Sequence, residues 1–129
     1  FGPGEGLFTS EFYGNCYNAL TENGILVNQH ESPYYDDDAK AMQRAHKRIK
    51  EFFDICRVYQ AHIPTCSSGY WLFGFASKKY HPLDDFRPEE WKKLGIKTRY
   101  YTTNLHRGAL MLPGYVEQML EEEENEKKA

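Results

Sequence analysis

Cysteine is scarce in this sequence and follows no disulfide or ligand pattern. The three cysteines are Cys16, Cys56 and Cys66, and no two of them form a C-x-x-C pair. An odd, scattered set argues against a disulfide framework or a zinc ribbon and is typical of a reducing compartment such as the cytoplasm. The five histidines show no H-x-x-x-H spacing. We therefore expect a cytoplasmic protein without a metal site.

Long apolar runs and an excess of positive charge are also absent. No stretch approaches the ~18 apolar residues of a membrane span. Sixteen basic and nineteen acidic side chains give a net charge of −3, and the five glutamates and two lysines of residues 121–129 account for all of it. The neutral remainder argues against nucleic acid as a partner. Because the chain opens Phe1-Gly2-Pro3 with neither methionine nor a signal segment, we expect translation to begin before Phe1.

Alternating helix and strand patterns fill the 129 residues, a length that suits one hydrophobic core. Period, capping residues and turn signals mark the elements. The expected order is a helix over about 9–20 capped by Thr9, a short buried strand over 25–29, a helix opened by the acidic run 36–38, strands over 55–63 and 70–77, a short helix near 88–94, and a last helix after Pro113.

This order predicts an α/β fold with an antiparallel hairpin at its end. Only one strand–helix–strand unit precedes the hairpin, and no Gly-rich phosphate loop follows any strand. Three strands would leave an exposed edge, so the chain resembles half of a doubly wound domain. We assign residues 1–120 to it and treat 121–129 as an acidic tail, frayed or disordered. The side chains of Cys16, Cys56, Trp71 and Phe73 are expected in the core.

Several stretches, in this order and spacing, resemble the polyamine aminopropyltransferases, the family of spermidine synthase. Each piece is weakly specific, whereas the ordered set is strongly so. The stretches are Leu7-Phe8-Thr9 with Glu11-Phe12-Tyr13, Gly24-Ile25 with Gln29 and Glu31-Ser32-Pro33, Ile63-Pro64-Thr65 with Ser68-Gly69 and Trp71, Ser77-Lys78-Lys79-Tyr80, and Tyr100-Tyr101 with His106 and Leu112-Pro113.

The resemblance implies the C-terminal half of a methyltransferase-like Rossmann domain with an antiparallel terminal hairpin. It also implies transfer of an aminopropyl group from decarboxylated S-adenosylmethionine, a co-substrate, to a diamine such as putrescine, without a cofactor. In the family the catalytic aspartates precede the residue that matches Phe1. We therefore expect no catalytic base in this chain and no transfer by the chain alone. The family forms homodimers, so a second copy or the missing N-terminal half is the expected partner.

The resemblance also implies binding roles for individual residues of this chain. Pro3 matches a proline that lies against the adenine of the nucleoside, and Gln29 matches a glutamine of the amine site. Cys66 stands where many members have an amine-holding tyrosine, and Ser67 replaces a proline. A thiol offers neither a phenol hydroxyl nor an aromatic face for a cation. Three identities of the acceptor therefore remain open: weakly bound putrescine, a longer diamine, and agmatine. Glu31, near Gln29, is a further candidate for binding the amine.

Alternatives remain at this stage for both residues and function. Asp36, Asp37 and Asp38 could attract a polycation, but helix capping explains them more simply. His106 is expected to hold packing and not to transfer protons. The chain could instead be a truncated, non-catalytic paralogue that pairs with a fuller chain, or a small-molecule methyltransferase on the same fold.

Overall fold

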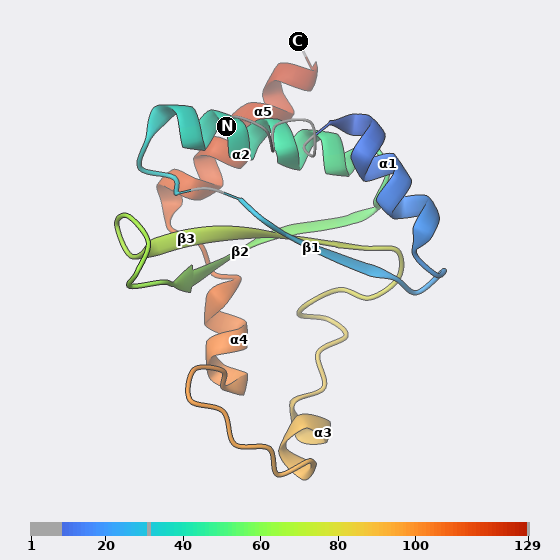
Figure 1. Ribbon diagram of the computed structural model, residues 1–129, viewed down its shortest axis with the longest axis vertical. Coiled ribbons are helices and arrows are strands. Elements are labelled where there is room, and N and C mark those ends of the chain that lie inside the picture. Colours follow the sequence, from blue (N-terminus) through green and yellow to red (C-terminus); the bar gives the residue numbers. More distant parts are fainter. Residues whose placement is uncertain (1–8, 31, 129) are drawn as a thin grey trace.

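A three-stranded sheet and five helices make up the part of the chain that the computed structural model describes, residues 9–30 and 32–128, with side chains up to Glu121 (Figure 1). In chain order they are α1 (Ser10–Ala19), β1 (Ile25–Gln29), α2 (Asp36–Lys50), β2 (Ile55–His62), β3 (Tyr70–Ser77), α3 (Pro88–Lys93), α4 (Thr103–Ala109) and α5 (Gly114–Lys128). All except α4 were expected from the sequence.

Strand β3 lies at the centre of the sheet, antiparallel to β1 on one side and to β2 on the other. The predicted β2–β3 hairpin is confirmed, with His62 paired to Tyr70 at its closed end. The sequence did not indicate that β3 would also pair with β1 and occupy the centre. The outer edge of β1 pairs with no other strand of the described residues.

Helices α1, α2 and α5 cover one face of this sheet (Figure 1). Apolar side chains of alternate strand residues meet the apolar side of α2 there, because successive strand residues point to opposite faces. Two clusters of buried residues result: Met42, Val58, Leu72 and Val116 in one, and Tyr13, Ile49, Phe53 and Ala76 in the other. Helices α3 and α4 lie on the opposite side of the sheet (Figure 1).

Local signals set the helix starts. The Thr9 side chain caps α1, accepting a hydrogen bond from the Phe12 N–H at 3.2 Å, as predicted. Three aspartates occupy the first turn of α2, where the helix dipole favours negative charge, although no side chain caps its N-terminus. In α4 the Thr102 hydroxyl caps the Leu105 N–H in the same way. That seven-residue helix was missed because it is too short to show a clear apolar period.

Strand β1 is not buried, contrary to the prediction. Ile25 and Val27 are 44% and 52% exposed, whereas Leu26 packs against the Tyr13 cluster. The run Ile25-Leu26-Val27 looks like a strand buried on both faces, but β1 is an edge strand that α1 and α2 cover on one face only. Trp71 and Phe73, expected in the core, are half-buried on that less covered face.

The two cysteines assigned to the core are also half-buried. Cys56 packs against the Tyr13 cluster, and its thiol donates to the Phe53 carbonyl at 3.3 Å. Cys16 lies on α1 and is half-buried. Their packing fits small structural side chains.

Candidate functional site

Gln29 is the last residue of β1, and its side chain is exposed. In the register it opposes Phe73, so it lies on the face of the sheet opposite to α2. The neighbouring Asn28 and His30 point to the helix-covered face, where Gly74 of β3 makes room for them. A Cβ at Gly74 would come within 2.3 Å of Asn28 Oδ1 and 2.6 Å of His30 Nε2. A glycine in β3 therefore lets the end of β1 pack closely.

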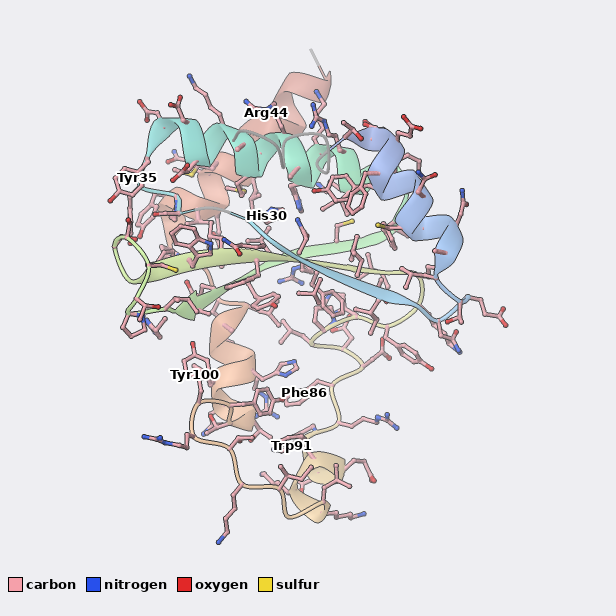
Figure 2. All side chains as sticks on the ribbon, in the orientation of Figure 1. His30, Tyr35, Arg44, Phe86, Trp91 and Tyr100 are labelled. Carbon is pink, nitrogen blue, oxygen red and sulfur yellow. The ribbon has the colours of Figure 1, made fainter. Side chains whose placement is uncertain are left out.

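His30 cannot act as a base near neutral pH. Its side chain is 1% exposed and lies between the sheet and α2 (Figure 2). Burial, and secondarily the charge of His46, lower the pKa of His30 to about 3. Its Nδ1 lies 3.4 Å from Asn28 Nδ2, while the buried Nε2 and Asn28 Oδ1 have no hydrogen-bond partner among the described residues. This imidazole stays neutral and has a structural role beside the strand end.

The β2–β3 loop that carries Cys66 closes on itself through the backbone. The Ile63 N–H donates to the Gly69 carbonyl, Cys66 N–H to the Ile63 carbonyl and Gly69 N–H to the Cys66 carbonyl, at 2.9 to 3.0 Å. Cys66 is half-buried within this turn. Ser68 and Gly69 both have a φ of +69°, in the left-handed region. The loop is therefore compact and tightly turned.

Two segments that the sequence analysis placed in one site lie together. Ser32, three residues after Gln29, has its Oγ 3.3 Å from the Oγ of Ser68, two residues after Cys66. The His30 N–H also donates to the Leu72 carbonyl at 2.9 Å, which extends the β1–β3 pairing past the end of β1. The end of β1 and the Cys66 loop thus form one edge of the molecule. We call this edge, residues 29–30, 32–34 and 63–70, the strand-end site.

Three tyrosines join the strand-end site to the C-terminal helix. The ring of Tyr34 lies 5.6 Å from that of Tyr70 and 5.7 Å from that of Tyr115, and the Tyr34 and Tyr115 hydroxyls are 2.6 Å apart. The hydrogen bond with Tyr34 is the main reason that the pKa of Tyr115 rises to about 12. Burial raises the pKa of Tyr70, whose hydroxyl donates to Gln60 Oε1. The sequence alone did not indicate that Tyr34 meets Tyr70 and Tyr115.

A separate cavity of about 330 Å³ lies between the sheet and α4. Its lining is mostly apolar and includes Val27, Phe75 and Leu105. His106 borders it, with Nδ1 2.8 Å from the Tyr101 hydroxyl, Nε2 2.8 Å from the Pro82 carbonyl and its ring stacked on Phe86. These contacts agree with the packing role expected for His106.

Two of the predicted site residues, Pro3 and Glu31, lie outside the described residues. Asp36, Asp37 and Asp38 begin α2 just beyond Tyr35, which marks the start of this helix in Figure 2. Across residues 9–30 and 32–121, no three His, Cys, Asp or Glu side chains gather in a way that could hold a metal ion. Nor does any helix in that part of the chain have the length and apolarity to cross a membrane.

Residues 1–87 match the family model described as the spermine/spermidine synthase domain. The chain belongs to this family. Among its relatives, a polyamine aminopropyltransferase of Alkaliphilus oremlandii is 69% identical over 124 residues, or 96% of this chain and 44% of the relative. One of Clostridium beijerinckii is 72% identical over 120 residues, or 93% of this chain and 42% of the relative. The resemblance drawn from the sequence motifs is thereby confirmed.

Solved structures of the family share this fold. A spermidine synthase in complex with the transition-state analogue AdoDATO matches with a TM-score of 0.83 and 39% identity over 90% of this chain and 40% of its own. The spermidine synthase of Thermotoga maritima matches with a TM-score of 0.82 at the same identity, over 88% of this chain and 38% of its own. The chain thus spans less than half the length of the relatives it matches.

Proposed function

We propose that this chain forms the amine-acceptor side of an aminopropyltransferase. The enzyme would move an aminopropyl group from decarboxylated S-adenosylmethionine to a diamine such as putrescine, giving spermidine. The observation that carries this proposal is the 69% identity, over 96% of the chain, to a relative named polyamine aminopropyltransferase. That name also favours aminopropyl transfer over the methyl transfer considered from the fold alone.

The chemistry requires a neutral amine in line with a carbon bonded to a sulfonium sulfur. An aliphatic amine is protonated near neutrality, since a lysine amine has a pKa of ~10.4, so a base must accept its proton. Once the amine is neutral, holding it against the carbon supplies much of the remaining rate gain. His30 is excluded as that base by its pKa of about 3. We assign the base to a carboxylate in polypeptide that precedes Phe1, as the family pattern implies.

Within this chain, the strand-end site is the proposed acceptor site. The exposed Gln29 amide oxygen can accept a hydrogen bond from an ammonium or amine group, and the carboxyl end of a strand is where open α/β sheets bind ligands. Cys66 lies on the adjoining loop and would shape the pocket for the acceptor. We further propose Glu31 as an amine-binding carboxylate and Pro3 as a contact of the adenine.

We also infer that β1, β3 and β2 are the C-terminal part of a doubly wound sheet. The unpaired outer edge of β1 and the exposed Ile25 and Val27 support this inference, because an apolar edge strand of this kind is normally covered. Further strands would come from the part of the relatives that this chain does not span. The same edge favours the second candidate, a non-catalytic chain that pairs with a fuller copy.

One experiment tests the function and separates the two candidates. The reading frame upstream of the Phe1 codon is sequenced, and the whole gene product is incubated with decarboxylated S-adenosylmethionine and putrescine. An upstream Asp-containing segment and the appearance of spermidine with the thioether nucleoside would support the enzyme. A start codon at Phe1, with no transfer until a fuller family member is added, would support the partner role. Consumption of a methyl acceptor in place of a diamine would contradict both.

A further inference from the structure

Ser68 adopts a backbone conformation that serine rarely takes. Its φ of +69° lies in the left-handed region, which disfavours residues other than glycine, asparagine and aspartate. Gly69, the next residue, has the same φ and pays no such steric cost. A glycine at position 68 would fit this turn better than serine does. The side chain of Ser68 therefore has to be explained by its contacts.

Those contacts form a directed chain between two segments. The Ser68 hydroxyl donates to the Tyr70 carbonyl at 3.2 Å, so its oxygen accepts from the Ser32 hydroxyl at 3.3 Å, because each hydroxyl has one proton to give. The Ser32 oxygen in turn accepts from the Tyr34 N–H at 3.3 Å. Ser32 is fully buried, so water does not compete for its hydroxyl. The chain links the segment after β1 to the start of β3.

We propose that Ser32 and Ser68 are positioning residues for the acceptor amine. This proposal rests on the proposed function. Ser32 is the third residue after Gln29 along one segment, and Ser68 is the second residue after Cys66 along the other. The hydroxyl pair fixes the spacing of these two sides of the strand-end site without touching the reacting atoms. Acceptor binding depends on this spacing, because a site already held in its bound geometry loses less conformational freedom when the amine binds.

The decisive variant is Ser68→Gly in the whole gene product. Glycine relieves the left-handed backbone, so the variant should unfold at the same or a higher temperature than the wild type. Loss of the hydroxyl should nevertheless raise the KM for the acceptor diamine about fivefold, the effect of one ordinary hydrogen bond. The KM for the nucleoside should stay within about twofold of the wild-type value, since no contact with the nucleoside is removed. If Ser68 had only a structural role, removing its hydroxyl would not raise the acceptor KM while the unfolding temperature stayed the same or rose.

Three further variants sharpen the test. Ser32→Ala should raise the acceptor KM by a similar factor. The double variant Ser32→Ala with Ser68→Gly should have an acceptor KM close to that of each single variant, since both substitutions remove the same link. Ser68→Asn tolerates the left-handed backbone and keeps a polar group, so it should recover most of the acceptor affinity. Thr21→Ala is the control: it removes an exposed hydroxyl outside the strand-end site and should change neither substrate's KM.

Hydrogen exchange keeps this proposal separate from the proposed function. Ser32→Ala should accelerate exchange of the Cys66 and Gly69 amides, which donate to carbonyls within the loop, and Thr21→Ala should not. Unchanged exchange, or an acceptor KM that Ser68→Gly leaves unaltered, would overturn the positioning role. If the wild-type protein transfers no aminopropyl group to putrescine or agmatine, and Ser32→Ala still accelerates the exchange, the proposed function is overturned and the link between the two segments stands.

Discussion

The helix-covered face of the sheet and the strand-end site are built by different means. On the covered face, Leu72, Val58 and Val116 are at most 2% exposed and belong to one apolar cluster. At the strand-end site, Gln29 is exposed, Cys66 is half-buried, and the segments are joined by hydroxyl and backbone hydrogen bonds. The first region is held together by apolar packing. The second presents polar groups outward, as a surface does that meets a ligand or further polypeptide.

This difference separates stability from function within one small domain. Apolar burial supplies most of the free energy of folding, so changes on the covered face should alter stability first. Changes at the strand-end site should alter substrate use while the fold stays intact. Four variants test this contrast, and they follow in order of decreasing expected effect.

Leu72→Ala should give the largest loss. Leu72 is 0% exposed in the centre of β3, and truncating such a side chain costs about 3 kcal/mol through lost burial and the cavity left behind. Urea unfolding followed by circular dichroism measures the change. Leu94→Ala, at a leucine that is 65% exposed, is the matched control and should stay within about 0.5 kcal/mol of the wild type. Equal losses at the two leucines would remove the distinction between the covered face and the surface.

His30 lies between the two regions and should make stability depend on pH. Its pKa is about 3 in the folded protein and 6.5 in the unfolded chain, so between these values the unfolded chain binds a proton that the folded one does not. The free energy of unfolding should therefore fall as the pH drops from 6.5 toward 3, with a slope that approaches about 1.4 kcal/mol per pH unit.

The same urea titrations, repeated from pH 7 to pH 4, measure this slope. His30→Asn should flatten it, whatever it does to stability at pH 7. His62→Gln, at an exposed histidine, should leave the slope unchanged. If the His30→Asn variant keeps the wild-type slope, His30 is not the group whose protonation destabilises the protein.

Sequence patterns were sufficient where structure is set locally. The hydroxyl of Thr9, the turn after Ala19 and the seven-residue loop between β2 and β3 each fix an element boundary through neighbours in the chain. The central place of β3 depends instead on pairing with β1, more than forty residues earlier. No local pattern encodes that choice, so the exposure of Val27 was also missed.

The candidate site divides in the same way. Gln29 and Cys66 could be named from motifs, because the motifs lie along single segments of the chain. The contact of Ser32 with Ser68, 36 residues apart, could not, since it needs the pairing of β1 with β3. The left-handed backbone of Ser68 was hidden for a further reason: serine is not a residue that signals such a conformation.

Gln29→Ala should alter function without altering stability. Removing an exposed amide should leave the unfolding temperature of the whole gene product unchanged, while the KM for the diamine rises about tenfold through loss of a hydrogen bond to a charged group. The KM for the nucleoside should not change. Asn18→Ala, at an exposed amide on α1, is the control and should affect neither. An equal rise in both KM values would remove Gln29 from the amine site.

Cys66→Tyr should have the smallest effect and improve activity. A tyrosine in this loop adds a phenol hydroxyl and an aromatic face for a cation, so the kcat/KM for putrescine should rise about two- to fivefold. Cys66→Phe supplies the face alone and separates the two contributions. A gain with both variants assigns the effect to the ring, and a gain with tyrosine alone assigns it to the hydroxyl. An acceptor preference that neither variant shifts would mean that the Cys66 side chain points away from the amine, and the strand-end site would then hold its substrate through the β1 segment alone.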